Sequence, residues 1–395
     1  MKILSLGTYP IKMPFHGGQR RVSALCRQHR AAGHQITYVA AYPAGAYGES
    51  LTETCDYAVS APDELGGGWA SDVVAGPYCA ENEEAYRHFS TIFNATEPDI
   101  ISLESPFLYA LAKKLQDDAG RPVKLIYSSQ NVEAPLKREV LNATGLDAKS
   151  VGRIVSAVES VEREAVERAD LVIAVSESDA AVYRTWAPKK HVIVRANGID
   201  APHATVFERP EYFPEPYVVF VGSAHIPNRD GFMNLIVGDG LQFLPPEKAI
   251  AVIGNVSDLI YQHPVFQRRV TSNCDRVQFY PNASDEALAT LLQHSNAVLL
   301  PISTGGGTNL KTAEALVAGK WVIGTPQSFR GYEVFQHDPN VIIAATRDEF
   351  VEGIRKALAN PPPALSQLQE DQRAALLWPR VLEGLDVNAE LSSAG

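Results

Sequence analysis

The segment richest in reactive and ligand-binding residues lies late in the chain, at residues 299–316. An apolar run is followed by three consecutive glycines at 305–307, and Lys311 and Glu314 follow at the start of a helical pattern. Glycines let a ligand approach the backbone, and the first turn of a helix binds anions through its free N–H groups. Lys311 adds a full positive charge, and Glu314 lies on the same helix face. The pattern predicts a site for a diphosphate with a ribose beside it, although an ordinary loop with a Lys–Glu pair stays open.

A second glycine loop lies near the start of the chain. Gly17 and Gly18 stand between the first apolar run and the first helical pattern. Ligands of open α/β sheets bind at the carboxyl ends of the strands, so these glycines are placed to meet a diphosphate or a sugar. The alternative is a flexible loop followed by a solvated arginine pair, Arg20 and Arg21.

A third loop follows the apolar run Tyr217–Val221. Gly222 and Ser223 are small and would leave space at the end of a strand. The next polar side chains are suited to phosphate or sugar; they are His225, Asn228 and Arg229. A simple turn with Asn228 as a helix cap is the alternative.

Short, continuous apolar runs alternate with helical patterns along the whole chain. Such runs are typical of strands buried on both faces of a parallel sheet. The first set of predicted strands is Ile3–Leu6, Ile36–Ala41, Asp99–Leu103, Val123–Tyr127, Leu171–Val175 and Val192–Val194. The second set is Tyr217–Val221, Ala249–Ile253, Arg276–Phe279, Ala297–Leu300, Trp321–Ile323 and Val341–Ala344. Helical spacing is seen at Gln19–Ala32, Lys149–Ala169, Asp285–His294 and Leu310–Ala318.

Two sets of strands separated by helices predict an α/β protein of two doubly wound domains. A turn dipeptide and three prolines between Asn197 and Pro216 place the boundary near residue 200. We therefore expect an N-terminal domain over residues 1–200 and a second domain over 201–370. After the three prolines at 361–363, residues 365–385 have a helical pattern. We expect a C-terminal helix within 371–395 that ends in a frayed tail.

Composition excludes several classes of protein. The 395 residues carry a net charge of −11, which argues against a general nucleic-acid binder. The four cysteines form no C-x-x-C pair, as expected for a cytoplasmic protein, and no apolar run is long enough to span a membrane. The sequence also lacks a D-x-D triplet, a zinc-protease motif, a nucleophile elbow, a complete P-loop and a dinucleotide fingerprint.

Taken together, these segments resemble glycosyltransferase family 4, whose members are retaining enzymes of the two-domain GT-B fold. The resemblance covers nearly the whole chain. Its carriers are Gly17–Gln19, Ser129–Glu133, Ala169–Ser178, Asn197–Asp200, Gly222–Ser223, Pro227–Asn228, Gly305–Ala315 and Gly319–Thr325. The family implies two Rossmann-like domains facing a central cleft, with a final helix that crosses back to the first domain.

The resemblance also implies roles for individual residues. A nucleotide-sugar donor would lie mainly on the second domain and the acceptor mainly on the first. The donor diphosphate would meet Lys311 and backbone groups of Gly307, Thr308, Asn309 and Leu310, while Glu314 would bind the ribose. Donor contacts are also expected from Gly17, Gly18, Gly222, Ser223 and Asn228. Catalytic roles are expected for Lys311, Glu314 and His225, and acceptor-side roles for Gln130, Asn131 and Glu133.

Three positions depart from the pattern of the family. Gly306 stands where the first glutamate of a paired-glutamate motif is expected, and Gln130 replaces a common histidine. His225 and Asn228, with Arg229 nearby, replace the arginine and lysine that often follow the first strand of the second domain. A nucleotide-sugar epimerase of the same fold and a non-catalytic nucleotide-sugar-binding subunit therefore remain alternatives.

The expected enzyme is a hexosyltransferase-like protein that needs neither a metal nor a cofactor beyond its co-substrate. UDP or GDP is expected as the nucleotide, and a saccharide or lipid-linked molecule as the acceptor, in the synthesis of polysaccharides or glycoconjugates. The inner face of the membrane is a possible location. Four basic residues could touch anionic headgroups there, or could simply form a solvated helix face; they are Lys137, Arg138, Lys149 and Arg153.

Overall fold

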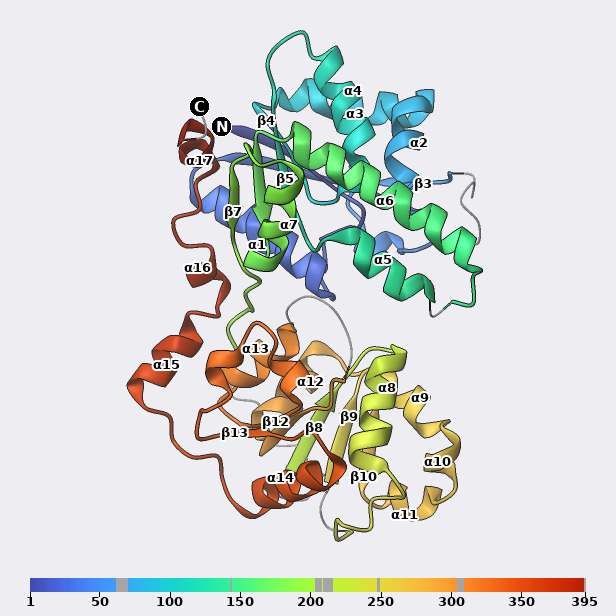
Figure 1. Ribbon diagram of the computed structural model, residues 1–395, viewed down its shortest axis with the longest axis vertical. Helices are drawn as coiled ribbons and strands as arrows, with labels where there is room; N and C mark the ends of the chain where they lie inside the picture. Colours follow the sequence, from blue (N-terminus) through green and yellow to red (C-terminus); the bar gives the residue numbers. More distant parts are fainter. Residues whose placement is uncertain are drawn as a thin grey trace. The chain divides into compact units, whose positions relative to one another are not determined.

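The structure is a computed structural model that divides into two compact units (Figure 1). It describes residues 1–61, 70–142, 144–202, 208, 216–246, 249–303 and 309–393. Unit 1 consists of residues 1–197 together with 381–395, and unit 2 of residues 198–380. The division falls at Asn197, and much of the proline-containing stretch from which a boundary near residue 200 was predicted lies outside the described residues.

Unit 1 is built around a parallel sheet with the strand order β3-β2-β1-β4-β5-β6-β7. Its strands are β1 (Lys2–Gly7), β2 (Gln35–Pro43), β3 (Tyr57–Val59), β4 (Ile100–Leu103), β5 (Lys124–Ser128), β6 (Leu171–Ala174) and β7 (Val192–Val194). The order reverses beside β1, where the chain goes to β2 on one side and to β4 on the other. That reversal is the topological switch point at which doubly wound sheets bind ligands.

Helices cover both faces of this sheet. They are α1 (Gly17–Ala31), α2 (Ala75–Glu81), α3 (Glu83–Thr96), α4 (Tyr109–Asp118), α5 (Glu133–Asn142), α6 (Ala148–Arg168), α7 (Glu177–Trp186) and α17 (Val387–Ser393), with short 3₁₀ turns η1 (Glu49–Leu51) and η2 (Pro106–Leu108). Leu4 and Leu6 of β1 share a core with Phe89 of α3 and Leu111 of α4. The side chain of Asp147 accepts from the backbone N–H groups of Lys149 and Ser150, which fixes the start of α6.

Unit 2 repeats the same design with one strand fewer, in the order β10-β9-β8-β11-β12-β13. The strands are β8 (Tyr217–Val221), β9 (Ala249–Ile253), β10 (Val277–Tyr280), β11 (Ala297–Leu300), β12 (Trp321–Gly324) and β13 (Val341–Ile343). All pairs are parallel, and the order reverses between β8 and β11. The predicted α/β class with two doubly wound domains is therefore confirmed.

The helices of unit 2 surround this sheet. They are α8 (Ile226–Phe232), a π-helical turn η3 (Met233–Val237), α9 (Val256–Tyr261), α10 (Pro264–Gln267), α11 (Val270–Cys274), α12 (Asp285–His294), α13 (Leu310–Val317), α14 (Arg347–Ala359) and α15 (Gln367–Ala374), with the 3₁₀ turns η4 (Pro326–Phe329) and η5 (Glu333–Phe335). A short helix α16 (Trp378–Val381) spans the division between the units.

The expectation of one long C-terminal helix is wrong. Residues 365–385 form two short helices, because the backbone between them leaves the helical path to bond with Ile199. The N–H of Ile199 donates to the carbonyl of Leu376 at 3.0 Å, and the N–H of Trp378 donates to the carbonyl of Ile199 at 3.0 Å. Gly384 then has a φ of 73°, a left-handed conformation that ends the segment.

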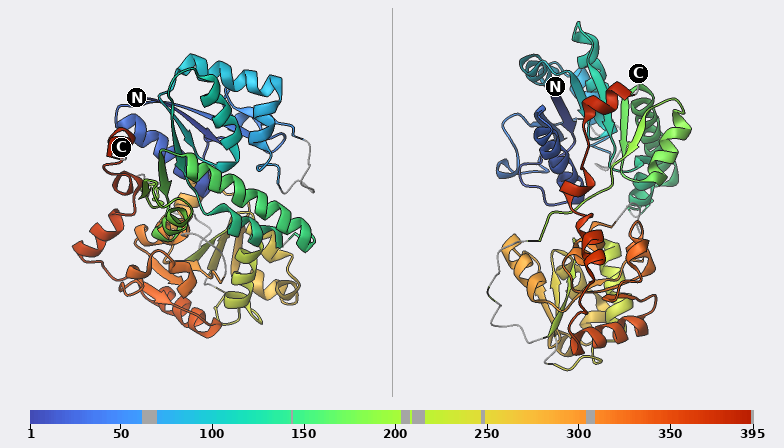
Figure 2. Two further views of the ribbon diagram at one scale, coloured as in Figure 1. Left: turned by 45° about the horizontal axis from the view of Figure 1, so that its top comes forward. Right: turned by 90° about the vertical axis from the view of Figure 1, so that its left-hand side faces the viewer.

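The expected frayed tail is also wrong for the residues that the structure describes. Val387–Ser393 form α17, which belongs to unit 1 and lies beside the start of β1 (Figures 1 and 2). Asp386 accepts from the ring of His34 at 3.2 Å, and Glu390 pairs with His191 at 3.1 Å and Arg195 at 3.3 Å. These contacts explain why so polar a segment is ordered.

Candidate functional site

In unit 2, α13 begins at the carboxyl end of β11 without a side-chain cap. Asn309 is the N-cap residue, but its side chain bonds to Thr312 Oγ1 at 3.0 Å instead of to the backbone of the helix. The first turn contains no acidic residue. The positive end of the helix dipole therefore meets no acidic side chain in its own first turn, a feature of helices that bind anions.

Lys311 lies in this first turn and is partly buried. Its Nζ donates to Asn228 Oδ1 at 3.2 Å, and the Asn228 amide in turn donates to the carbonyl of Ser223 at 3.0 Å. Burial lowers the pKa of Lys311, while the charge of Glu314 acts in the opposite direction. A partly buried ammonium bonded to a neutral amide attracts an anion more strongly than a fully solvated one, because less water screens it. The structure thus brings Lys311, Asn228 and Ser223 together, with Glu314 near enough to act on the lysine.

Two residues predicted beside them are placed differently. His225 is exposed and its ring makes no hydrogen bond to any described residue, so only its backbone takes part in the turn that starts α8. Arg229 forms an ion pair with the neighbouring Asp230 at 2.7 Å and is therefore not a free cation for a phosphate. No contact of the His225 side chain with the described residues supports the catalytic role that was expected for it.

Close packing at the ends of the strands accounts for two glycines. A Cβ at Gly222 would lie only 3.0 Å from Cγ1 of Val256. Gly254, at φ 97°, lies so near the carbonyl of Gly222 that a side chain there would collide with it. Sequence reasoning missed Gly254, although a glycine directly after the apolar run of β9 was the available signal.

Gly231 of α8 lies against the carbonyl of Pro301, directly after β11. We expect Gly231→Ala to lower the free energy of unfolding by about 1–3 kcal/mol, because an added methyl group would press on backbone that is not free to move. Denaturant unfolding measures this change. Gly152→Ala is the matched control, since a methyl group on α6 at Gly152 would meet nothing within 4 Å. Equal stability of the two variants would contradict the packing argument.

A pocket of about 390 Å³ opens beside this packing, within unit 2. It is lined by Gly231, Asn234, Leu235, Ile302, Ser303, Thr325, Pro326, Gln327 and Ala345. These residues come from α8 and η3 and from the carboxyl ends of β11, β12 and β13, which is the ligand-binding edge of such a sheet. The segment Gly319–Thr325 was already singled out in the sequence, but the contributions of Asn234 and Gln327 to this pocket were not predicted.

Only some of the remaining predicted donor-binding residues lie in the part of the chain that the structure describes. Gly307 and Thr308 lie outside the described residues, as does the whole glycine triplet. Leu310 begins α13 as expected, and Glu314 is partly exposed on the same helix.

In unit 1, the loop with Gly17 and Gly18 forms the start of α1. His16 and Gln19 make a capping box, in which His16 Nδ1 accepts from the Gln19 N–H at 3.4 Å and Gln19 Oε1 accepts from the His16 N–H at 3.3 Å. A methyl group at Gly18 would meet the hydroxyl of Tyr9 at 2.6 Å. Side chains of the protein itself thus bind part of the start of α1. Close packing against Tyr9 explains a glycine at position 18, in addition to the ligand contact predicted for it.

The three predicted acceptor-side residues follow β5 directly. The side-chain nitrogen of Gln130 is buried without a hydrogen-bond partner among the described residues. The carbonyl of Asn131 accepts from the hydroxyls of Ser129 at 2.9 Å and Tyr183 at 2.8 Å. Glu133 begins α5, and its backbone N–H donates to Glu162 at 2.8 Å. The structure therefore gathers these residues at the carboxyl edge of the sheet.

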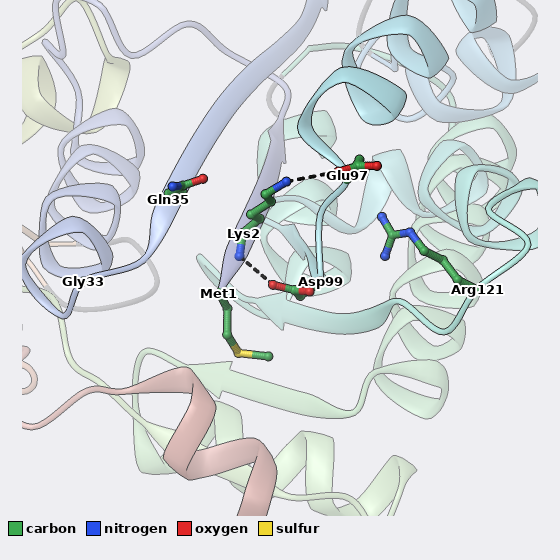
Figure 3. Close-up of a pocket in the computed structure, with 7 residues that line it drawn as sticks. All are labelled: Met1, Lys2, Gly33, Gln35, Glu97, Asp99 and Arg121. Carbon is green, nitrogen blue, oxygen red and sulfur yellow. Dashed lines mark hydrogen bonds and ion pairs between the residues drawn. The ribbon is translucent and has the colours of Figure 1, made fainter.

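A larger hollow, of about 470 Å³, lies at the opposite edge of this sheet (Figure 3). Lys2 spans it, pairing with Glu97 at 3.2 Å through its side chain and with Asp99 at 2.7 Å through its backbone N–H. Arg121 lines the same hollow. Ligands of doubly wound sheets bind at the carboxyl ends of the strands, and this hollow is at the amino ends. We therefore do not assign the active site to it.

The structure also bears on the four basic residues that could touch anionic headgroups. Lys137 pairs with Asp72 at 2.7 Å, and its side chain is only 12% exposed, so it is not available to a lipid headgroup. Over the described residues, no helix combines the length and apolar character needed to cross a bilayer. The same residues contain no grouping of three or more His, Cys, Asp or Glu side chains arranged to hold a metal ion.

Two units, each built on a parallel sheet with helices around it, define the GT-B class of α/β proteins. Residues 15–202 match the model of Glycosyltransferase Family 4, and residues 269–375 match the model of Glycosyl transferases group 1. The chain therefore carries glycosyltransferase domains in both units, as the resemblance in its sequence indicated. No curated protein sequence matches the chain.

Solved structures with the same fold cover the whole chain. Sucrose-phosphate synthase from Thermosynechococcus elongatus is 17% identical with a TM-score of 0.68, and all of both chains is covered. The lipopolysaccharide outer core galactosyltransferase WaaB is 14% identical with a TM-score of 0.58, covering 100% of this chain and 99% of that one. HepE of Anabaena, in complex with UDP and glucose, is 16% identical with a TM-score of 0.57, covering 100% and 98%. At these identities the likeness shows the fold.

Proposed function

We propose that this protein is a retaining glycosyltransferase that moves a sugar from a nucleotide-diphosphate sugar to a saccharide or lipid-linked acceptor. The observation that carries the proposal is the partly buried Lys311 beside the start of α13, where the side chain of Asn309 does not cap the helix. The match of this region to glycosyltransferase group 1 supports it. The solved complexes of HepE with UDP and glucose and of Arabidopsis starch synthase IV with ADP and acarbose support a nucleotide-sugar donor.

In the proposed reaction, the bond from the anomeric carbon to the diphosphate breaks, and its electron pair leaves with the diphosphate. The acceptor oxygen bonds to the same carbon from the same face, and its proton passes to the leaving phosphate. The transition state resembles an oxocarbenium ion, while negative charge grows on the diphosphate. Lys311 and the N–H groups at the start of α13 would stabilise that charge, and Glu314 would hold the ribose.

This mechanism asks for no metal and no cofactor besides the donor, for which UDP or GDP is our first choice. We place the reaction in the cytoplasm, where it would serve the assembly of a polysaccharide or glycoconjugate. A lipid-linked acceptor would be held at the inner face of the membrane.

An epimerase is the second candidate, because a putative UDP-N-acetylglucosamine 2-epimerase from Listeria monocytogenes has the same fold at a TM-score of 0.53 and 11% identity. Incubation with the donor alone separates the two, since only an epimerase changes the sugar without an acceptor.

Nucleotide binding provides the direct test of the donor site. We expect one series among UDP, GDP, ADP, dTDP and CMP, with their sugars, to raise the melting temperature of the wild type. At about 100 times the dissociation constant, the free energy of unfolding should rise by about 2.7 kcal/mol. The shift should disappear in Lys311→Ala. If no nucleotide stabilises the wild type, the proposed function is contradicted. A non-catalytic protein with a degenerate donor site would then be favoured, an alternative suggested by Gly306, which stands in place of the expected first glutamate.

A further inference from the structure

Three aromatic side chains of unit 1 gather at the carboxyl ends of two neighbouring strands. Phe15 lies in the loop between β1 and α1, while Tyr42 lies in β2 and Tyr47 in the loop that follows it. β1 and β2 pair in parallel, so both loops leave the same edge of the sheet. The ring centroids of Phe15 and Tyr47 are 6.3 Å apart, and those of Tyr42 and Tyr47 are 5.6 Å apart. We call these three residues the aromatic cluster; it stands at the edge where such sheets bind ligands.

The aromatic cluster is supported from within unit 1 by His16. The ring of His16 packs nearly perpendicular to Phe15, with centroids 5.3 Å apart, and to Tyr9, with centroids 4.9 Å apart. Tyr9 is itself fixed, because its carbonyl accepts from the hydroxyl of Tyr38 in β2. The exposed ring of Phe15 therefore rests on packed side chains and does not hang from a free loop.

A buried glutamine fixes the backbone that carries Phe15. Gln19 is only 1% exposed, and its Oε1 accepts from the N–H groups of Phe15 at 2.9 Å and His16 at 3.3 Å. Its Nε2 donates to the carbonyl of Pro10 at 2.8 Å, at the other end of the same loop. One side chain thus holds both ends of the loop. A side chain presented in this way is in position before a ligand arrives, which lowers the entropy cost of binding.

Phe15 keeps more than half of its surface in water. It is 58% exposed, and Met13 in the same loop is 57% exposed. Large apolar side chains that stay exposed together mark a binding surface. Because the loop is bonded at both ends and His16 and Tyr47 flank the ring, Phe15 is held in this exposed position.

Hydrogen-bond donors without partners lie among these rings. The hydroxyl groups of Tyr42 and Tyr47 bond to no residue that the structure describes. His16 Nδ1 accepts from the N–H of Gln19 at 3.4 Å, so the neutral ring carries its proton on Nε2, which also bonds to no described residue. Burial and the charge of Arg20 lower the pKa of His16, which keeps the ring neutral at pH 7. Ring faces and free donors therefore stand side by side.

This combination matches a sugar ring better than a lipid. The C–H groups on one face of a pyranose lie well against the negative face of an aromatic ring, while its hydroxyl oxygens accept from donors at the rim. An alkyl chain would leave those donors without partners, which is costly. Anionic headgroups are also poorly matched, because residues 44–56 contain three acidic residues and no basic one. The nearby Lys12 donates to the carbonyl of Thr52 at 2.9 Å.

We propose that the aromatic cluster, together with the imidazole N–H of His16, forms a subsite of unit 1 on which a pyranose ring of the acceptor stacks. This inference rests on the proposed function and chooses a saccharide from the two kinds of acceptor that the function leaves open. One face of the sugar lies on the ring of Phe15, and its oxygens accept from His16 and a tyrosine hydroxyl. The subsite lies beside β2, on the other side of β1 from the predicted acceptor-side residues that follow β5.

Saturation-transfer-difference NMR tests the stacking, with the methyl glycosides of glucose, galactose, mannose and N-acetylglucosamine as probes. In the wild type, we expect at least one glycoside to bind, with the strongest saturation on the C–H protons of one ring face. Phe15→Ala and Phe15→Leu should both weaken this binding about tenfold, because leucine keeps apolar surface but has no ring face. Phe15→Trp should retain it. Tyr261→Ala, which removes an exposed aromatic ring of unit 2, is the matched control and should bind as the wild type.

A variant of His16 separates its donor from its role at the start of α1. Asparagine is a good N-cap residue, so His16→Asn leaves an acceptor for the N–H of Gln19 and should melt near the temperature of the wild type. Its shorter side chain does not place an N–H where the imidazole Nε2 stands. Binding of the same glycoside should therefore weaken about threefold, the usual effect of losing one hydrogen bond.

Two results would overturn the subsite: no glycoside gives face-selective saturation with the wild type, or Phe15→Ala binds as tightly as the wild type. Sedimentation with vesicles of phosphatidylcholine and phosphatidylglycerol tests the other occupant. Vesicle binding that Phe15→Ala loses would assign the aromatic cluster to a lipid surface and overturn the proposal. Nucleotide-induced stabilisation is measured on the same proteins. Its absence from the wild type means that the proposed function fails; its presence without glycoside binding means that only the subsite fails.

Discussion

Replacing Lys311 by alanine should lower the rate of sugar transfer by at least about a hundredfold. One preorganised donor aimed at developing negative charge contributes about 2.7–4 kcal/mol to catalysis, and Lys311 is held for that purpose by Asn228 at 3.2 Å. Initial rates at saturating donor and acceptor measure the loss. A water molecule that enters the partly buried space left by the lysine carries no full positive charge, so it cannot replace this contribution.

The control for this variant is another lysine of unit 2. Lys320 is also partly buried, but it donates to the carbonyl of Gln293 at 2.5 Å, away from the start of α13. Lys320→Ala should leave the rate within a few fold of the wild type. A loss below about fivefold for Lys311→Ala, with the protein folded, would remove Lys311 from the proposed mechanism.

Replacing Arg373 by alanine should destabilise unit 2 by about 3–5 kcal/mol, the usual result of removing one partner of a buried ion pair. The guanidinium of Arg373 pairs with Asp338 at 2.5 Å, and these side chains are only 4% and 9% exposed. It also donates to the Leu316 carbonyl at 2.8 Å in the last turn of α13. Denaturant unfolding measures the change, and loss of the arginine also frees the end of the helix that carries Lys311.

A double variant separates the charge from the packing. Arg373→Met combined with Asp338→Leu leaves no unpaired charge, so it should recover much of the lost stability. Arg268→Ala, an exposed arginine of the same unit, should change stability by less than about 0.5 kcal/mol. If Arg373→Ala is as stable as Arg268→Ala, the buried pair does not hold α13.

Much of the fold could be predicted because its strands are apolar on both faces. The predicted runs Ala297–Leu300 and Val192–Val194 coincide with β11 and β7. The strand β3 was missed, since it has three residues at the edge of the sheet and its central Ala58 is exposed. A short edge strand carries too little periodicity to be distinguished from a loop.

The site was harder to predict, because its chemistry depends on contacts distant in sequence. Lys311 was identified from its glycine-rich surroundings, but its partner Asn228 lies 83 positions earlier. The ion pair of Arg229 joins it to its neighbour Asp230, but the support of Glu133 by Glu162 spans 29 positions, which no local pattern encodes. The C-terminal prediction failed for the same reason, since Ile199 competes for the backbone of residues 376–378.

The return of the chain to unit 1 has a consequence for biosynthesis. Unit 2 is continuous in sequence, and its first and last segments run side by side through the bonds between Ile199 and residues 376–378. Unit 1 is interrupted, and Asp386 must reach His34 across 352 positions. All seven strands of unit 1 leave the ribosome before unit 2 does, but α17 leaves it last. The sheet of unit 1 therefore forms without the contacts of α17, and these are added only after the whole of unit 2 has been made.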